Sequence, residues 1–276
     1  MAVTAHERFA RLARLPDEQI DLAEAALLIA AEAEPALDAA ACLRELDALA
    51  AAAAEHLTPE AGPRARVEAL GRFLFEQEGF QGNAADYYDA RNSFLHEVLR
   101  RRTGIPITLA LVFMELGKRL GLPMEGVNFP GHFLVRHTAP DGEVLVDPFS
   151  GRVLSALDCE HLLRRTAGPQ AQLAPHLMQA ATPKGVLRRM LTNLKLIYLH
   201  QRAWPEALSC MERILLLAPD DPHELRDRGL LFLRLECHAE AAADLERYLI
   251  LAGHEPAAET VRPYLDEARA KARHLN

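Results

Sequence analysis

The chain lacks the features that mark several classes of protein. Its 276 residues include four cysteines, which lie far apart and form no C-x-x-C pair, so the sequence predicts neither a disulfide framework nor a zinc site. No run approaches the roughly 20 apolar residues that a membrane helix needs. The first fifteen residues mix charges with apolar residues, unlike a signal peptide. We therefore expect a cytoplasmic protein with no metal, no cofactor and no membrane partner.

Positive charge is also scarce. Lys and Arg number 31 against 39 Asp and Glu, and the net charge of -8 argues against a nucleic-acid surface. The densest basic cluster, residues 100–102, suits the end of a helix, where the dipole favours cations. Half of the residues are hydrophobic and 25% are charged, as in globular proteins that bury a core. The length allows one large domain or two ordinary ones.

Helical patterns fill the first 120 residues. Residues 1–57 are rich in alanine, with apolar stripes that predict helices over 17–33 and 37–57. Another amphipathic helix is expected over 64–77, and residues 86–92 indicate an ordered loop that leads into a helix capped by Asn92 or Ser93. Pro106 is predicted to begin the next helix, which is apolar on nearly every side and therefore central.

Three short β-type runs follow, over residues 125–129, 131–137 and 143–149, with a hairpin turn at 138–142. If the turn centres between Pro140 and Asp141, paired residues sum to 281, so His132 is expected to face Phe149. Asp147 then shares the face of His132 as a diagonal neighbour at roughly 7 Å. A one-residue slip in register would separate the two side chains. A histidine and an aspartate on adjacent strands are laid out as a base and its orienting carboxylate.

The C-terminal third contains a repeat with an offset of 34 residues. Its first unit departs from the second at one place, where Lys195 stands for Gly229. Helix pairs with an aromatic in the first helix and a small alanine early in the second predict a tetratricopeptide-like (TPR) domain, closed by a capping helix over 256–275. The residues that match are Leu191, Tyr198, Ala207 and Met211 in the first unit and Leu225, Phe232, Ala241 and Leu245 in the second.

Several longer motifs resemble the bacterial SirB family, which is similar to transglutaminases in its core and carries a TPR tail. The resemblance implies an α+β fold, mainly helical, in which a small antiparallel, papain-like sheet packs on a central helix and TPR-like helix pairs follow. We expect domains over residues 1–180 and 181–276. The motifs are residues 79–83 (GFQGN), 88–95 (YDARNSFL), 104–108 (GIPIT), 129–135 (FPGHFLV), 146–149 (VDPF), 189–195 (RMLTNLK) and 226–230 (RDRGL).

The same resemblance implies a triad from which one member is missing. Transglutaminase-like enzymes carry a cysteine at the start of the central helix, in the motif Gly-x-Cys-x-x-x-Ala, followed by His and Asp on successive strands. Laid on residues 104–110, the motif puts Pro106 at the cysteine position, while His132 and Asp147 match the other two members. The loss of a triad nucleophile costs on the order of 10⁶ in rate. The chain therefore resembles the superfamily without its ordinary thiol chemistry.

Two functions remain open from the sequence. The first is a pseudoenzyme that binds a protein or peptide through its cleft or its TPR surface, with Asn92, Ser93 and Thr108 as candidate binding residues, in a regulatory role that the family resemblance implies. The second is a hydrolase or acyltransferase in which Thr108 or another residue is the nucleophile and His132 is the base. Each hydroxyl also has a plain structural interpretation, and Cys159, in a predicted helix start, is the remaining thiol candidate. His132 and Asp147 are equally compatible with a buried polar pair kept for the fold.

Overall fold

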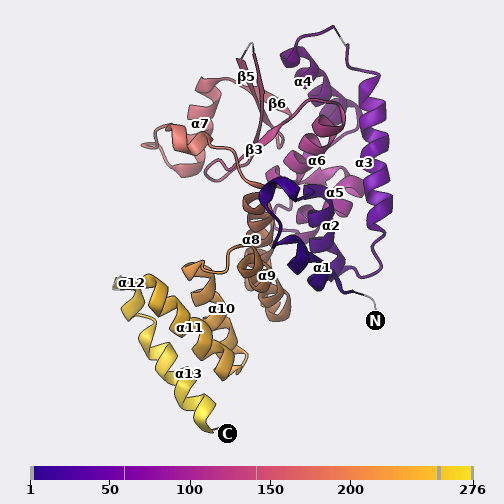
Figure 1. The fold of residues 1–276 in the computed structure, drawn as a ribbon. Helices are drawn as coiled ribbons and strands as arrows, with labels where there is room; N and C mark the ends of the chain where they lie inside the picture. The colour runs from indigo at the N-terminus through magenta and orange to yellow at the C-terminus, as the bar shows by residue number, and fades with distance from the viewer. Residues whose placement is uncertain (1–2, 59, 141, 254–255, 275–276) are drawn as a thin grey trace. The chain divides into compact units, whose positions relative to one another are not determined.

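The chain folds into two compact units, Met1–Met190 and Leu191–Asn276. Helix α8 (Pro183–Gln201) begins in the first unit and ends in the second. The predicted domain boundary after residue 180 stays a prediction. The computed structural model describes residues 3–58, 60–140, 142–253 and 256–274 (Figure 1).

The first unit opens with α1 (Ala5–Leu12), which was not predicted as a separate helix, followed by helices whose apolar stripes were predicted. The helix predicted from residue 17 begins only at Leu22, after a 3-10 turn. Asp21 and Asp38 begin two of these helices, because each carboxylate accepts a hydrogen bond from a backbone N–H three residues on. The helix predicted over 64–77 is continuous but changes to a π-helical turn, η2, after Arg72. The helices are α1 (Ala5–Leu12), α2 (Leu22–Ala33), α3 (Ala39–Ala54), α4 (Pro63–Arg72) with η2 (Phe73–Gln77), and α5 (Leu95–Arg101); Asp17–Gln19 forms a 3-10 turn.

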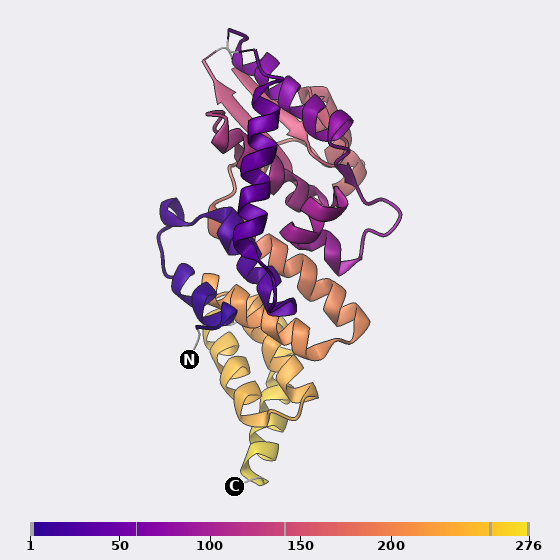
Figure 2. The same ribbon diagram turned by 90° about the vertical axis from the view of Figure 1, so that its right-hand side faces the viewer.

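Helix α6 (Pro106–Arg119) is the central helix, as predicted. Every residue from Pro106 to Gly117 is buried, because α3, α4 and α5 and the sheet all pack against it. Figure 2 shows the long α3 running in front of this helix group. Proline at the first position costs no hydrogen bond, since that N–H has no partner within a helix.

A four-stranded antiparallel sheet follows in the order β3-β4-β5-β6. Val135 pairs with Val146, so the predicted register, in which paired residues sum to 281, is confirmed. The predicted turn residue Asp141 lies outside the described residues. The second strand begins three residues later than predicted, which leaves His132 in the loop before it, and β6 was missed. The strands are β3 (Glu125–Val127), β4 (Leu134–Ala139), β5 (Gly142–Asp147) and β6 (Arg152–Leu154).

The sheet lies between two helical layers (Figure 1). Helix α7 (Ala156–Ala167) covers one face, where Cys159 and Leu162 pack with Val127 and Leu134. Helices α4 and α6 lie against the other face. Two further short strands, β1 (Gln81–Gly82) and β2 (Thr103–Gly104), pair in parallel just before α6, and a 3-10 turn, η4 (Pro175–Met178), leads toward α8.

The second unit has the predicted pairs of repeat helices. Ala207 and Met211 of the first pair pack against Leu231 of the second. Gly229 allows close packing, since a Cβ there would stand 2.8 Å from the Leu245 side chain. The predicted capping segment forms two helices instead of one, and its last residue, Leu275, lies outside the described residues. The helices after α8 are α9 (Trp204–Leu217), α10 (Pro222–Arg234), α11 (His238–Ala252), α12 (Pro256–Glu259) and α13 (Arg262–His274).

Candidate functional site

His132 is the last residue of a tight turn that requires glycine at position 131. Its N–H donates to the Phe129 carbonyl at 3.0 Å, and Gly131 has φ +65°. A Cβ on Gly131 would also stand 2.8 Å from the Thr166 side chain, so both the conformation and the space favour glycine. The turn places the His132 ring against Asp147, with Nε2 2.7 Å from Oδ1 and both side chains about nine-tenths buried. The pair that the sequence predicted is therefore in contact.

Asp147 is held as an anion at the end of β5. Its Oδ1 also accepts from the Phe149 N–H at 2.9 Å, and its Oδ2 accepts from the Ser150 hydroxyl at 2.7 Å. Burial raises the pKa of this carboxyl, but the hydrogen bond and charge of His132, with the bonds from Ser150 and Phe149, hold its pKa below the ordinary value. An ionised Asp147 accepts a hydrogen bond from the His132 Nε2 when that nitrogen carries a proton. Nδ1 is then the ring nitrogen that can accept a proton.

No described residue hydrogen-bonds to Nδ1 of His132. That nitrogen is also absent from the fully buried, unpartnered polar atoms of the described chain, so solvent reaches it. In its neutral form, an oriented imidazole with such an open nitrogen can act as a base or accept a hydrogen bond from a ligand. The geometry by itself fits both roles.

The N-terminus of α6 carries Pro106 at its first position and no side-chain cap at Ile105. Thr108, one turn in, is completely buried and its hydroxyl stays within the protein. The hydroxyl donates to the Asn92 carbonyl at 2.7 Å and accepts from the Ile105 N–H at 3.2 Å. Thr108 thus ties the start of α6 to the preceding loop.

A chain of contacts connects this helix end to the histidine. The pairing of β1 with β2 puts Gly82 beside Gly104, two residues before Pro106. Gly82 supports the Phe149 ring, because a Cβ there would stand only 2.4 Å from it. The Phe149 ring in turn meets the His132 ring edge-on at 6.2 Å between centroids. The helix start and the His132–Asp147 pair therefore belong to one region of the fold.

Asn92 and Ser93 are placed differently from the prediction that one of them caps a helix. Both are completely buried in a 3-10 turn, η3 (Ala90–Ser93), which Asp89 caps, and α5 begins after Phe94 without a side-chain cap. The cap prediction was wrong because the Asn92 side chain hydrogen-bonds to the preceding loop and not to a helix N-terminus. Its Nδ2 donates to the carbonyls of Asp86 at 2.7 Å and Tyr87 at 3.3 Å.

Asn83 completes this support. Its Nδ2 donates to Oδ1 of Asn92 at 3.1 Å, and its own Oδ1 accepts from the Asp86 N–H at 2.9 Å. The hydroxyl of Ser93 has no partner among the described residues. The predicted binding residues Asn92 and Thr108 therefore lie beneath the loop that they shape.

That loop presents aromatic residues that the sequence analysis did not select. Tyr87 is 40% exposed and Tyr88 72% exposed, and their rings meet edge-on at 5.4 Å. Tyr87 also meets Phe149 at 6.3 Å. We call Tyr87, Tyr88 and Phe149 the aromatic face. Two neighbouring exposed tyrosines, connected to His132 through Phe149, can be recognised only from the fold, because composition cannot show which aromatics stay outside the core.

Neither Cys159 nor Cys42 has the lowered pKa of an activated thiol. Cys159 is 1% exposed in the core beneath α7, and burial raises the pKa of its thiol. Burial and nearby acidic residues, Glu45 first, also raise the thiol pKa of Cys42. An activated cysteine shows the opposite shift, since the thiolate is the nucleophile.

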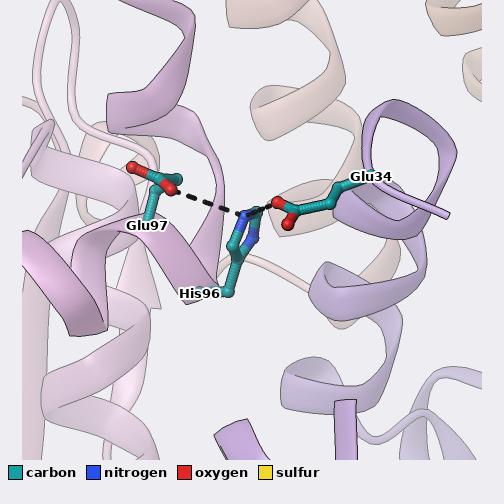
Figure 3. A group of neighbouring side chains, drawn as sticks. All are labelled: Glu34, His96 and Glu97. Carbon is teal, nitrogen blue, oxygen red and sulfur yellow. Dashed lines mark hydrogen bonds and ion pairs between the residues drawn. The ribbon is translucent and has the colours of Figure 1, made fainter. Parts of the chain in front are cut away.

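A cluster with the spacing of metal ligands lies elsewhere, between α2 and α5. His96 Nε2 is 2.9 Å from Oε2 of Glu34 and 3.8 Å from Oε1 of Glu97 (Figure 3). Arg100 holds both oxygens of Glu97 at 2.7 and 2.8 Å, and the buried Nδ1 of His96 has no partner among the described residues. A metal-bound histidine normally donates its other N–H to an acceptor. The contacts fit a polar link between helices better than a metal site.

Comparison with known proteins covers nearly the whole chain. A family model described as "Transglutaminase-like superfamily" matches residues 40–192, and a tetratricopeptide-repeat model matches residues 194–266. A UPF0162 protein of Xylella fastidiosa is 39% identical over 262 residues, which is 92% of each chain. A UPF0162 protein of Pseudomonas aeruginosa is 39% identical over 237 residues, or 86% of this chain and 87% of that protein.

Protein SirB1 of Salmonella typhimurium is 29% identical over 223 residues, which is 80% of this chain and 83% of that protein. Among the described helices, none has the length and apolar character to cross a membrane. The predicted fold class is confirmed, with a transglutaminase-like region followed by repeats that generally mediate protein–protein interaction. The chain belongs to the transglutaminase-like superfamily, as a member of the SirB (UPF0162) family with a tetratricopeptide-repeat tail.

Proposed function

We propose that this protein is a cytoplasmic binding protein that uses a transglutaminase-like site without thiol chemistry, in a regulatory role. The observation that carries the proposal is Pro106, which begins α6 at the position where the resembled enzymes carry cysteine. Proline offers neither a nucleophilic side chain nor a backbone N–H, so the helix start can supply no thiolate. The retained pair of His132 and Asp147 then serves recognition.

The surroundings of the pair support a ligand. Tyr87 and Tyr88 are exposed and are connected to the pair through the Phe149 ring. Aromatic side chains with a polar tip are common at interfaces. The loop that bears them is held by the bonds of Asn92, so the tyrosines are presented on a fixed backbone. A rigid aromatic surface loses little entropy on binding. The repeat unit adds a second surface of a kind that binds peptides.

The alternative enzyme has less support. Thr108 donates its hydroxyl to the Asn92 carbonyl and is completely buried, so a substrate would have to displace that bond. Ser93 is equally buried, although its hydroxyl lacks a described partner. Neither hydroxyl has the contact with a base that activates a nucleophile among the described hydrogen bonds.

Two measurements test the proposal. Active-site probes for serine, threonine and cysteine nucleophiles should give no labelling that depends on His132. Capture of cellular proteins by the full-length chain should lose a partner with Tyr88→Ala on the aromatic face or Leu196→Ala on the repeat, and keep it with Leu15→Ala, an exposed apolar residue outside both surfaces. Labelling that disappears in His132→Ala would favour the enzyme. Unchanged capture by all three variants would contradict the binding role of these surfaces.

A further inference from the structure

Arg189 carries a charge that none of the described carboxylates pairs with. Its Nη1 donates to the side-chain oxygen of Asn128 at 2.7 Å, and no described carboxylate forms an ion pair with it. The side chain is half-buried. A partly desolvated guanidinium that bonds only to a neutral amide retains donors for an anion.

Other arginines of the first unit are paired differently. Arg91 and Arg101 both lie within ion-pair distance of Asp89, at 2.8 and 3.5 Å. Arg119 binds Asp47 at 2.7 Å, and Arg102 binds Glu45 at 2.9 Å. In a chain with a net charge of -8, carboxylates are plentiful. Arg189 differs from these four arginines, because its described partner is a neutral amide and not a carboxylate.

Arg189 lies at the site already described. Its partner Asn128 directly precedes the turn that begins at Phe129 and ends at His132. Arg189 is also close enough to Tyr87 for its charge to lower the pKa of that phenol, although burial raises this pKa more. Tyr87 meets Phe149, and Phe149 meets His132. Arg189 and His132 therefore both lie near the aromatic face.

We infer that Arg189 and the aromatic face form a subsite for a peptide that presents a carboxylate beside an aromatic or large apolar side chain. The guanidinium fork matches a carboxylate, and Arg189 has donors left after its bond to Asn128. The exposed Tyr88 ring and Phe149 would receive the adjacent side chain, with the open Nδ1 of His132 as a further polar contact. This inference rests on the proposed function and names its ligand class.

Three short peptides and one ion test this assignment on the full-length protein. Acetyl-Ala-Phe carries a free terminal carboxylate, its C-terminal amide carries none, and acetyl-Asp-Phe-amide carries the carboxylate on a side chain. Backbone amide signals of Asn128, Gly131 and Tyr88 in NMR titrations report binding at the site. We expect binding of at least one carboxylate peptide and at least about tenfold weaker binding of the neutral amide, since hydrogen bonds to charged groups are strong. The preferred carboxylate peptide distinguishes a chain terminus from an acidic side chain.

Variants separate charge, geometry and folding. Arg189→Gln should weaken the favoured peptide by about tenfold, and Arg189→Lys, which keeps the charge but loses the fork, should be intermediate. Asn128→Ala removes the protein partner of Arg189 without removing the cation, so binding should largely persist. Arg44→Gln is the charge-matched control, because Arg44 is 68% exposed on α3. If Arg189→Gln does not fold, the intermediate affinity expected for Arg189→Lys still tests the role of the guanidinium.

The outcomes also separate this inference from the proposed function. Equal binding of the acid and amide peptides at these signals, or no effect of Arg189→Gln and Arg189→Lys, would overturn the carboxylate subsite and leave a binding site without thiol chemistry intact. Displacement by inorganic phosphate at equal concentration would overturn the peptide assignment in favour of a general anion site. His132-dependent labelling by nucleophile probes is the result that contradicts the proposed function instead.

Discussion

Lys195 in α8 donates to Glu224 in α10 at 2.7 Å, and both side chains are more than nine-tenths buried. Lys195 occupies the repeat position at which the next unit has Gly229. The lysine that replaces the repeat glycine is therefore paired with Glu224 of α10, and Asp227 is its second partner at 3.4 Å. Burial raises the pKa of Glu224, and Lys195 opposes that rise.

Lys195→Met should destabilise the second unit by about 3 kcal/mol or more at neutral pH, because it leaves a buried carboxylate unpaired. The deficit should shrink as the pH is lowered, since a carboxyl with a raised folded pKa gains stability when it binds a proton below that pKa. Trp204, the single tryptophan, lies in this unit and reports its unfolding by fluorescence. The double variant Lys195→Met, Glu224→Leu should recover most of the loss. An equal loss at all pH values would contradict the ion-pair explanation.

Gly82→Ala should displace the Phe149 ring, because the new methyl would stand 2.4 Å from it. We expect a loss of about 1–3 kcal/mol in unfolding free energy, typical of an overpacked contact, together with shifted amide signals at His132. Gly71→Ala is the matched control: its Cβ would meet only Phe113, at 4.0 Å, in helix α4. That substitution should be neutral or stabilising through helix propensity. Similar destabilisation by both alanines would show that space at Gly82 is not the cause.

Asp147→Asn should lower stability by about 2 kcal/mol at neutral pH, because the anion accepts three hydrogen bonds. The folded pKa of Asp147 is depressed, so its contribution is complete above the ordinary pKa of 3.8 and is lost as the pH falls below it. Urea unfolding at a series of pH values should therefore show a gap between wild type and variant that narrows in acid. Ser150→Ala removes one of the three bonds and should cost less, with most of the acid dependence retained.

Local patterns were sufficient to predict much of this fold. The hairpin register followed from the turn and the alternation of apolar residues, and it brought His132 close to Asp147 before either was seen in three dimensions. Pro106 at a helix start and the apolar faces of α6 followed from rules that act within one or two turns. The repeat helices followed from an offset that recurs along the chain.

The remainder of the candidate site depends on contacts between distant segments. Thr108 donates to the Asn92 carbonyl, although 16 residues separate them in the sequence. Asn92, which was predicted to cap a helix, is therefore buried beneath the loop that carries the tyrosines. Gly82 and Phe149 are far apart in sequence. Neither motif could therefore predict that the Phe149 ring lies between Gly82 and His132. The unpaired state of Arg189 is likewise defined by what surrounds it. Such features depend on tertiary packing, which single-residue propensities do not contain.

Pro106→Cys tests whether the site still holds the geometry of the enzymes it resembles. A thiol at the first position of α6 lies at the positive end of the helix dipole, and His132, if it faces this position, would lower the thiol pKa further. Position 106 is buried, so the informative comparison is between variants that share this burial. We expect alkylation by iodoacetamide at neutral pH to be about tenfold faster at this thiol with His132 present than with His132→Ala, because the thiolate fraction rises tenfold for each unit of pKa. Peptide mass spectrometry separates this reaction from those of the native cysteines.

The second substitution, His132→Ala, decides what a fast reaction means. If His132 faces the helix start, the introduced thiol should slow in the double variant Pro106→Cys, His132→Ala and keep only the smaller effect of the helix terminus. Cys159, buried and with a raised thiol pKa, should stay unreactive in every variant and so confirm that the core is intact. Equal rates with and without His132, in variants that remain folded, would show that the histidine is not oriented toward Pro106. The family motif would then place the missing nucleophile at the wrong residue.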